Sequence, residues 1–272
     1  MAGIELVGKI GSMALIERGD IDYNKFARIG RQLRPGIVWV TSGATEIGRL
    51  DYMRRNGSEL TGDRDEIKTD YAAQGQSILM QTYRMFIDEK YSVRQLLVEH
   101  RHFNDPVKRR HIADMLVRSA EQGAIPIVNY NDAVSVEENR KMEIEKLRAS
   151  QESVCELVDN DETAAQIACM VEAKTLLILS TLDGIFYDVS DKSSLIKTIC
   201  GKTKEETLKL IDEAKSRCVG TSREGSNGAS AKLEYIKPCV ISGTRVIIAS
   251  AKYDISDILL GFAPRTVIHS AC

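Results

Sequence analysis

A lysine between two glycines, placed directly after an apolar run, is the first feature of this sequence with a chemical meaning. Residues 4–7 have the composition of a buried strand, and Gly8-Lys9-Ile10-Gly11-Ser12 follows at once. Glycines let backbone N–H groups approach an oxyanion closely, and Lys9 adds a point charge beside them. The stretch predicts a phosphate site that is not a P-loop, because the G-x-x-x-x-G-K-[ST] order is absent. A plain Gly-Lys turn is the alternative.

Small or polar side chains also follow later apolar runs, at the strand ends where open α/β sheets bind ligands. Ser42 and Gly43 come after residues 37–40, and Asn129, Asn131 and Asp132 come after residues 125–128. Two amides and a carboxylate are costly to bury without partners, so we expect a pocket for a polar, partly cationic substrate. A helix N-cap and an Asx-rich turn are the structural alternatives.

Two expected helix starts carry further candidates. Residues 159–161 read Asp-Asn-Asp, and one cap needs only one such residue, so three in a row exceed capping. Residues 220–228 are rich in glycine and precede a helix expected at 229–241, which carries Lys232. Aligned N–H groups at such a helix start can bind phosphate, although a flexible linker has a similar composition.

The elements that must position these residues alternate between strand and helix. Strands are expected at residues 4–7, 37–40, 93–98, 125–128, 175–179, 244–249 and 266–269. Helices are expected at residues 21–33, 70–91, 105–123, 159–170, 203–215 and 229–241. Residues 51–69 look like a mobile surface segment, and residues 135–158 like a solvated helix or a flexible flap. The alternation predicts an α/β fold, a three-layer αβα sandwich around a mainly parallel sheet.

Composition excludes several classes of protein. The 272 residues are 43% hydrophobic and 28% charged, as in ordinary globular chains, and the net charge of −2 offers no nucleic-acid footprint. No apolar run approaches membrane-spanning length, and no basic, apolar leader opens the chain, so we expect no membrane association and a cytoplasmic location. Six scattered cysteines and four histidines lack the spacing of a metal site, so none is expected.

Placed in order, six sequence blocks make the chain similar to the amino acid kinase family, and within it to the glutamate 5-kinase branch. Each block is weak alone, but together they cover nearly the whole chain. The resemblance implies one domain over residues 1–272, with an acceptor-binding part at about 1–170 and a nucleotide-binding part at about 171–272. It does not extend to the small C-terminal PUA domain of many members. The blocks are residues 9–13 (KIGSM), 42–49 (SGATEIGR), 72–80 (AAQGQSILM), 129–134 (NYNDAV), 159–165 (DNDETAA) and 225–232 (GSNGASAK).

The resemblance implies that ATP phosphorylates the side-chain carboxylate of L-glutamate, the first step of proline biosynthesis, with Mg²⁺ arriving on the nucleotide. It also implies a homo-oligomer, either a dimer or a tetramer. The catalytic residues implied are Lys9, Lys232 and Asp161. The acceptor-binding residues implied are Ser42, Gly43, Ala44, Asn129, Asp132, Asp159 and Asn160. The nucleotide-binding residues implied are Lys9, Gly11, Ser12, Ser180, Thr181, Gly225, Ser226, Asn227, Gly228 and Lys232.

Departures from the family pattern leave the acceptor open. Tyr130 replaces a glutamate, Thr181 an aspartate, and Asn227 and Ala229 a glycine and a methionine. The segment between residues 134 and 159 is also longer than in typical members. We expect it to form a flap or an intersubunit contact over the acceptor site.

Two alternatives remain to the glutamate kinase. One is a kinase of the same fold that acts on another acceptor, such as uridylate or another small acid. The block at 72–80 and the Asp-Asn-Asp triplet favour the glutamate branch over it. The other is a non-catalytic ligand-binding member, which the presence of Lys9, Lys232 and Asp161 disfavours.

Overall fold

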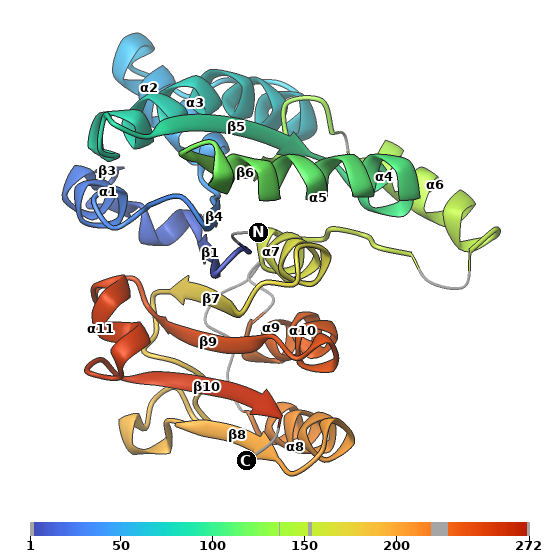
Figure 1. The fold of residues 1–272 in the computed structure, drawn as a ribbon. Coiled ribbons are helices and arrows are strands. Elements are labelled where there is room, and N and C mark those ends of the chain that lie inside the picture. Colours follow the sequence, from blue (N-terminus) through green and yellow to red (C-terminus); the bar gives the residue numbers. More distant parts are fainter. Residues whose placement is uncertain (1–2, 136, 152–153, 219–227, 271–272) are drawn as a thin grey trace.

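A single eight-stranded sheet organises the molecule (Figure 1). The computed structural model describes residues 3–135, 137–151, 154–218 and 228–270. The strand order is β5-β6-β4-β1-β7-β9-β10-β8, and all neighbours are parallel except β9 and β10. A separate antiparallel hairpin follows β1. The strands are β1 (Leu6–Ile10), β2 (Ile16–Glu17), β3 (Asp20–Ile21), β4 (Ile37–Val40), β5 (Ser92–Val98), β6 (Ala124–Tyr130), β7 (Thr175–Ser180), β8 (Thr198–Gly201), β9 (Arg245–Ser250) and β10 (Arg265–Ser270).

Helices cover both faces of this sheet, so the predicted αβα sandwich is confirmed (Figure 1). One face carries α1 (Tyr23–Gly30), α2 (Ala44–Asn56), α3 (Arg64–Phe86) and α11 (Ile255–Leu260). The other face carries α4 (His100–Asn104), α5 (Pro106–Glu121), α7 (Asn160–Met170), α8 (Lys204–Arg217), α9 (Gly228–Tyr235) and α10 (Lys237–Ser242). The helix α6 (Glu137–Arg148) lies beyond α4 at one end, and two 3₁₀ turns, η1 (Ser12–Ala14) and η2 (Lys192–Ser194), complete the described elements. None of the described helices is long and apolar enough to cross a membrane.

The central strands are mainly apolar because helices bury both of their faces, and their polar residues lie at or near the strand ends. Along β1, Val7 points into one hydrophobic cluster, and Leu6 and Ile10 point into the other. A Cβ atom on Gly8 would lie 2.2 Å from the ring of Trp39, so this glycine makes room for the indole. The first glycine beside Lys9 therefore serves packing.

The prediction of a mobile segment at residues 51–69 is wrong. The helix α2 continues to Asn56 and α3 already begins at Arg64, so only residues 57–63 connect them. The ion pair between Arg55 and Asp51 supports the last turns of α2, and Asp63 caps α3. Charged residues at helical spacing thus formed helices that lack an obvious apolar stripe.

The glycine in the middle of the expected long helix marks a close helix crossing. A Cβ atom on Gly75 would lie 1.8 Å from the carbonyl oxygen of Ala44, and one on Gly48 would lie 1.8 Å from that of Tyr71. The two glycines let α2 and α3 touch backbone to backbone. This contact holds the start of α2 beside the middle of α3.

Two further differences concern the C-terminal half. The helix expected at 229–241 is divided into α9 and α10, and Pro238 lies in the first turn of the second helix. The short strand β8 and the antiparallel run of β10 were not anticipated. Residues 137–148 do form a helix, one of the two forms expected for that segment.

Candidate active site

The predicted chemistry gathers at the carboxyl edge of the sheet because the central strands are parallel. Lys9 on β1 lies in register with Val40 on β4 and with Ile178 on β7. The turns that follow these three strands therefore emerge side by side. The edge of β6 joins them through its pairing with β4.

Two lysines and one aspartate form the centre of this edge. Lys9 Nζ lies 2.5 Å from Asp161 Oδ1, and Lys232 Nζ lies 2.8 Å from Asp161 Oδ2. Burial alone would raise the pKa of Asp161, but the charges of Lys9 and Lys232 hold it at about 2. The carboxylate is therefore ionised at neutral pH, and the three groups together carry a net charge of +1.

The charge, the free hydrogen-bond donors and the open space at this centre suit a phosphoryl group. Lys9 and Asp161 are buried and Lys232 is half-buried, so the excess positive charge is only partly solvated and an anion would be stabilised beside it. Each lysine has three N–H donors and spends only part of them on Asp161. A Cβ atom on Gly11 would stand 3.6 Å from Lys9 Nζ, so its absence leaves open the space in front of the ammonium.

The three residues of the Asp-Asn-Asp triplet have different roles, and only the first of them caps the helix. Asp159 accepts the backbone N–H groups of Asp161 and Glu162 at 2.7 and 3.1 Å, so it is the N-cap of α7. Burial and the nearby charge of Asp161 raise the pKa of Asp159. Asp161 faces the lysines, and Asn160 faces the acceptor side.

A chain of amides connects the acceptor-binding candidates. Asn160 Nδ2 donates to Ser42 Oγ at 2.8 Å and lies 3.2 Å from Asn129 Oδ1, while Asn129 Nδ2 donates to Gln76 Oε1 at 2.8 Å. Gln76 Nε2 and Asn160 Oδ1 are buried and have no partner among the described residues. One is a donor and the other an acceptor, so a ligand that offers both kinds of group would satisfy them.

Gln76 was not among the predicted site residues. It stands inside the block at 72–80 that carries the resemblance, and it is a half-buried amide on the helix that packs against α2. The one feature of the sequence that could have identified Gln76 is its position one residue after Gly75, where the two helices approach most closely. The backbone contact could not be recognised without the fold.

The turn before α2 places Ser42. Gly43 adopts φ +105°, a left-handed conformation that favours glycine, and α2 begins immediately after it. Ala44 is buried with its side chain in the core, so only its backbone can serve a ligand. Gly43 is therefore a conformational requirement, and Ser42 supplies the side chain.

Asp132 occupies a corner with two cations that the sequence did not reveal. Lys68 Nζ on α3 lies 3.9 Å from Asp132 Oδ1. Burial raises the pKa of Asp132, and the charges of Lys68 and Arg140 oppose this shift. The carboxylate was expected to meet a cationic group, and within the protein it already does.

The nucleotide-side candidates lie on neighbouring turns. Ser180 Oγ bonds to the N–H and the carbonyl of Leu182, which closes the turn after β7, and Thr181 beside it is exposed. An ion pair of 2.8 Å between Lys252 and Asp183 joins this turn to the one after β9. This pair was not anticipated, because the two residues are far apart in sequence.

The remaining candidates are the phosphate-cradling positions. Gly11 N–H is 3.4 Å from the carbonyl of Leu179, Ser12 begins η1, and Gly228 begins α9 with φ +52°. Gly225, Ser226 and Asn227 lie outside the described residues. Within the described ranges there is no cluster of three or more His, Cys, Asp or Glu side chains that could hold a metal ion.

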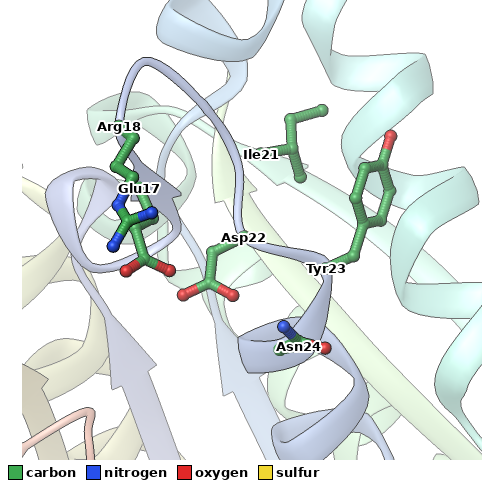
Figure 2. Close-up of a pocket in the computed structure, with 6 residues that line it drawn as sticks. All are labelled: Glu17, Arg18, Ile21, Asp22, Tyr23 and Asn24. Carbon is green, nitrogen blue, oxygen red and sulfur yellow. The ribbon is translucent and has the colours of Figure 1, made fainter.

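Two cavities lie away from these residues. One of about 430 Å³ is a shallow hollow lined by the hairpin and the start of α1, where the carboxylates of Glu17 and Asp22 lie side by side (Figure 2). A larger one of about 790 Å³ opens at the opposite edge of the sheet, near Leu6, Ile37 and Thr175. Neither of these two is lined by a predicted site residue.

The fold and the paired lysines are those of an α/β protein that can hold an anion at the carboxyl edge of its sheet. The model of the amino acid kinase family matches residues 5–250, and the chain belongs to this family. The fold is that of solved kinases: TM-scores are 0.60 against the carbamate kinase of Giardia lamblia and 0.56 against the UMP kinase of Ureaplasma parvum. Identities are 15% and 11%, and the alignments cover 99% and 100% of this chain and all of each structure.

Curated relatives of this chain are glutamate 5-kinases. That of Streptococcus suis is 30% identical over 92% of this chain, and that of Thermoanaerobacter sp. (strain X514) is 28% identical over 92%. The enzyme of Clostridium perfringens is 28% identical over 91% of this chain. This chain spans 65%, 63% and 87% of the lengths of these three relatives, respectively.

Proposed function

We propose that the protein is an ATP-dependent kinase that transfers the γ-phosphoryl group to the carboxylate of a small acid. The observation that carries the proposal is the pair of lysines joined by Asp161 at the carboxyl edge of the sheet. Phosphoryl transfer requires chiefly in-line positioning and neutralisation of charge on the transferred group. Lys9 and Lys232 would flank that group, and Asp161 would orient both ammonium groups.

The same centre favours an acceptor that is already an anion. A hydroxyl acceptor needs a base that removes its proton, but Asp161 has a pKa of about 2 and is occupied by two lysines. A carboxylate is deprotonated at neutral pH, and its oxygen can attack the γ-phosphorus directly. The bond from phosphorus to the β-phosphate oxygen then breaks, and the products are ADP and an acyl phosphate.

The nucleotide would bind at the turns after β1, β7 and β9, in the part of the chain from about residue 171 onward together with Lys9. Gly11, Ser12, Ser180, Thr181 and the 225–228 segment are the proposed contacts. Mg²⁺ bound to the nucleotide would neutralise phosphate charge, and phosphate oxygens and water would supply most of its ligands.

We infer that the acceptor is L-glutamate and that the product enters proline biosynthesis. The names of the relatives support this acceptor, as do the free donor on Gln76 and the free acceptor on Asn160, which suit an amino acid. Ser42, Gly43, Ala44, Asn129, Asp132, Asp159 and Asn160 belong to the proposed acceptor part, at about 1–170. The proposal also includes a single domain over residues 1–272 and assembly of the chain into a homo-oligomer.

Turnover of ATP against a panel of acceptors tests this function. We expect ADP release with L-glutamate and Mg²⁺, and capture of the acyl phosphate as a hydroxamate by hydroxylamine. L-Aspartate, N-acetyl-glutamate, UMP and carbamate serve as alternative acceptors. Turnover with one of them would replace glutamate in the proposal, and ATP binding without any turnover would favour a ligand-binding member of the family.

A further inference from the structure

The helix α6 lies at the acceptor end of the proposed site, outside the eight-stranded sheet and the helices that cover it. It lies beside α4, where His100 Nε2 and Glu143 Oε2 are 2.9 Å apart (Figure 1). Ile144 on its inner face is buried, with 6% of its surface exposed. These contacts fix the helix against the body of the protein, so its inward side chains have defined positions.

Arg140 is the inward-facing cation of this helix. It is half-buried, and its Nη1 donates to the carbonyl of Leu157 at 3.2 Å, three residues before Asn160. The Tyr130 hydroxyl lies 3.0 Å from Ser135 Oγ, and the nearby charge of Arg140 opposes the rise that burial causes in the pKa of this tyrosine. Arg140 thus lies between the end of β6 and the start of α7, the two elements that supply the acceptor amides.

The hydrogen-bonding capacity of Arg140 is not used up by these contacts. Its Nε is buried and has no hydrogen-bond partner among the described residues. A guanidinium has five N–H donors and binds carboxylates in a two-point fork. A buried donor without a partner is costly, so an oxygen ligand at this position would be stabilising.

The charge of the surrounding corner also favours an anion. Lys68 and Arg140 both act on Asp132, so these three groups carry a net charge of +1. Two further carboxylates lie near this corner. Glu99 accepts from Asn131 at 3.2 Å and is paired with Arg101 at 2.9 Å. Glu162 accepts the N–H of Val158 at 2.8 Å, and burial raises the pKa of its carboxyl. The excess positive charge of the corner is therefore not cancelled by Glu99.

We propose that Arg140 is a specificity-determining residue that binds the second, non-reacting carboxylate of the acceptor. The inference rests on the proposed kinase function. The reacting carboxylate would lie at Lys9 and Lys232, the Asn160 carbonyl would accept from the ammonium group of the acceptor, and the Gln76 amide would donate to a carboxylate oxygen. An acceptor with two anionic ends fits this arrangement better than a monoanion does.

The test compares L-glutamate with isoglutamine, its α-amide, which keeps the reacting γ-carboxylate and lacks the charge of the other. We expect the unaltered protein to prefer glutamate in kcat/KM, and Arg140→Gln to raise the KM for glutamate by about 10- to 100-fold with little change in the KM for ATP. The same substitution should bring the ratio of kcat/KM for glutamate to kcat/KM for isoglutamine close to one. Arg140→Lys should restore part of the preference, because it retains the charge without the fork.

Lys146→Gln is the matched control, since it removes an exposed positive charge from the same helix. Lys146→Gln should leave kcat/KM for both acceptors unchanged. Glutamate turnover with an unaltered acceptor ratio in Arg140→Gln would overturn the inference and leave the kinase standing, because a purely structural arginine affects both acceptors alike. A protein that turns over neither acceptor would overturn the proposed glutamate kinase itself, and the role of Arg140 with it.

Discussion

The two ends of the proposed site differ in how completely their polar groups are paired. At the lysine centre, both oxygens of Asp161 are ion-paired with an ammonium group at 2.5 and 2.8 Å, although the pair at Oδ1 lacks hydrogen-bond geometry. At the acceptor end, Gln76, Asn160 and Arg140 each keep a buried polar atom without a partner among the described residues. The first end is preorganised for charge that develops in a reaction. The second end is incomplete in a way that a ligand can complete, and the predictions below test this difference.

The largest expected effect is on stability, from Asp161→Asn. Removing the carboxylate leaves Lys9 and Lys232 facing each other with no counter-charge, and breaking a buried pair in this way costs about 3–5 kcal/mol. Denaturant unfolding measures the loss. Asp183→Asn, which removes a more exposed partner of Lys252, should cost about 1 kcal/mol or less, and equal losses in the two variants would contradict the account.

Lys232→Met should lower kcat by about 10²–10³-fold, because the loss of one preorganised donor to the transferred group has this magnitude. The fold should persist, since Lys9 still pairs with Asp161. Steady-state ADP release and circular dichroism measure the two quantities. Lys209→Met, an exposed lysine on α8, is the control; unaltered kcat in Lys232→Met would remove Lys232 from the mechanism.

Acid should weaken the lysine centre in a defined pH window. The folded pKa of Asp161, about 2, lies below its unfolded value near 3.9, so its contribution is full above pH 4 and is lost as the pH falls through 2. The contribution is about 2 kcal/mol. The difference in unfolding free energy between the unaltered protein and Asp161→Asn should therefore shrink by about 2 kcal/mol as the pH falls from 4 to 2, and parallel curves would contradict the assignment.

Gln76→Glu should have the smallest effect, a rise of about 10-fold in the acceptor KM. The substitution replaces the free N–H donor with a negative charge, which repels a carboxylate and removes one hydrogen bond. The KM for ATP should not change. Gln74→Glu on the same helix is the matched control, because the Gln74 amide donates to Asp51 instead. A similar rise in the acceptor KM in both variants would show that Gln76 does not contact the acceptor.

The residues of the lysine centre could be singled out from the sequence by local patterns, and the family resemblance implied that they act together. A strand that ends at Lys9 and an Asp-Asn-Asp triplet at a helix start are both local signals. The alternation of strands and helices likewise indicated the sandwich and its parallel core.

The acceptor end could not be predicted to the same depth, because its contacts join segments that are distant in sequence. Gln76 meets Asn129 across 53 residues, and Lys68 meets Asp132 only because α3 passes the carboxyl end of β6. The helix at 137–148 has too weak an apolar stripe to reveal that Arg140 points inward. The mistaken segment at 51–69 has a similar cause, since capping and ion pairs rather than an apolar face define its helices.

The central claim is that a carboxylate oxygen of the acceptor attacks the γ-phosphorus at the lysine centre. The most direct test uses glutamate labelled with ¹⁸O in its γ-carboxylate, with ATP, Mg²⁺ and hydroxylamine. Hydroxylamine attacks the acyl carbon and expels phosphate, which keeps the oxygen that formed the new bond. The account predicts inorganic phosphate with one ¹⁸O atom per hydroxamate formed. Unlabelled phosphate would show that water rather than the acceptor receives the phosphoryl group, and would contradict the account.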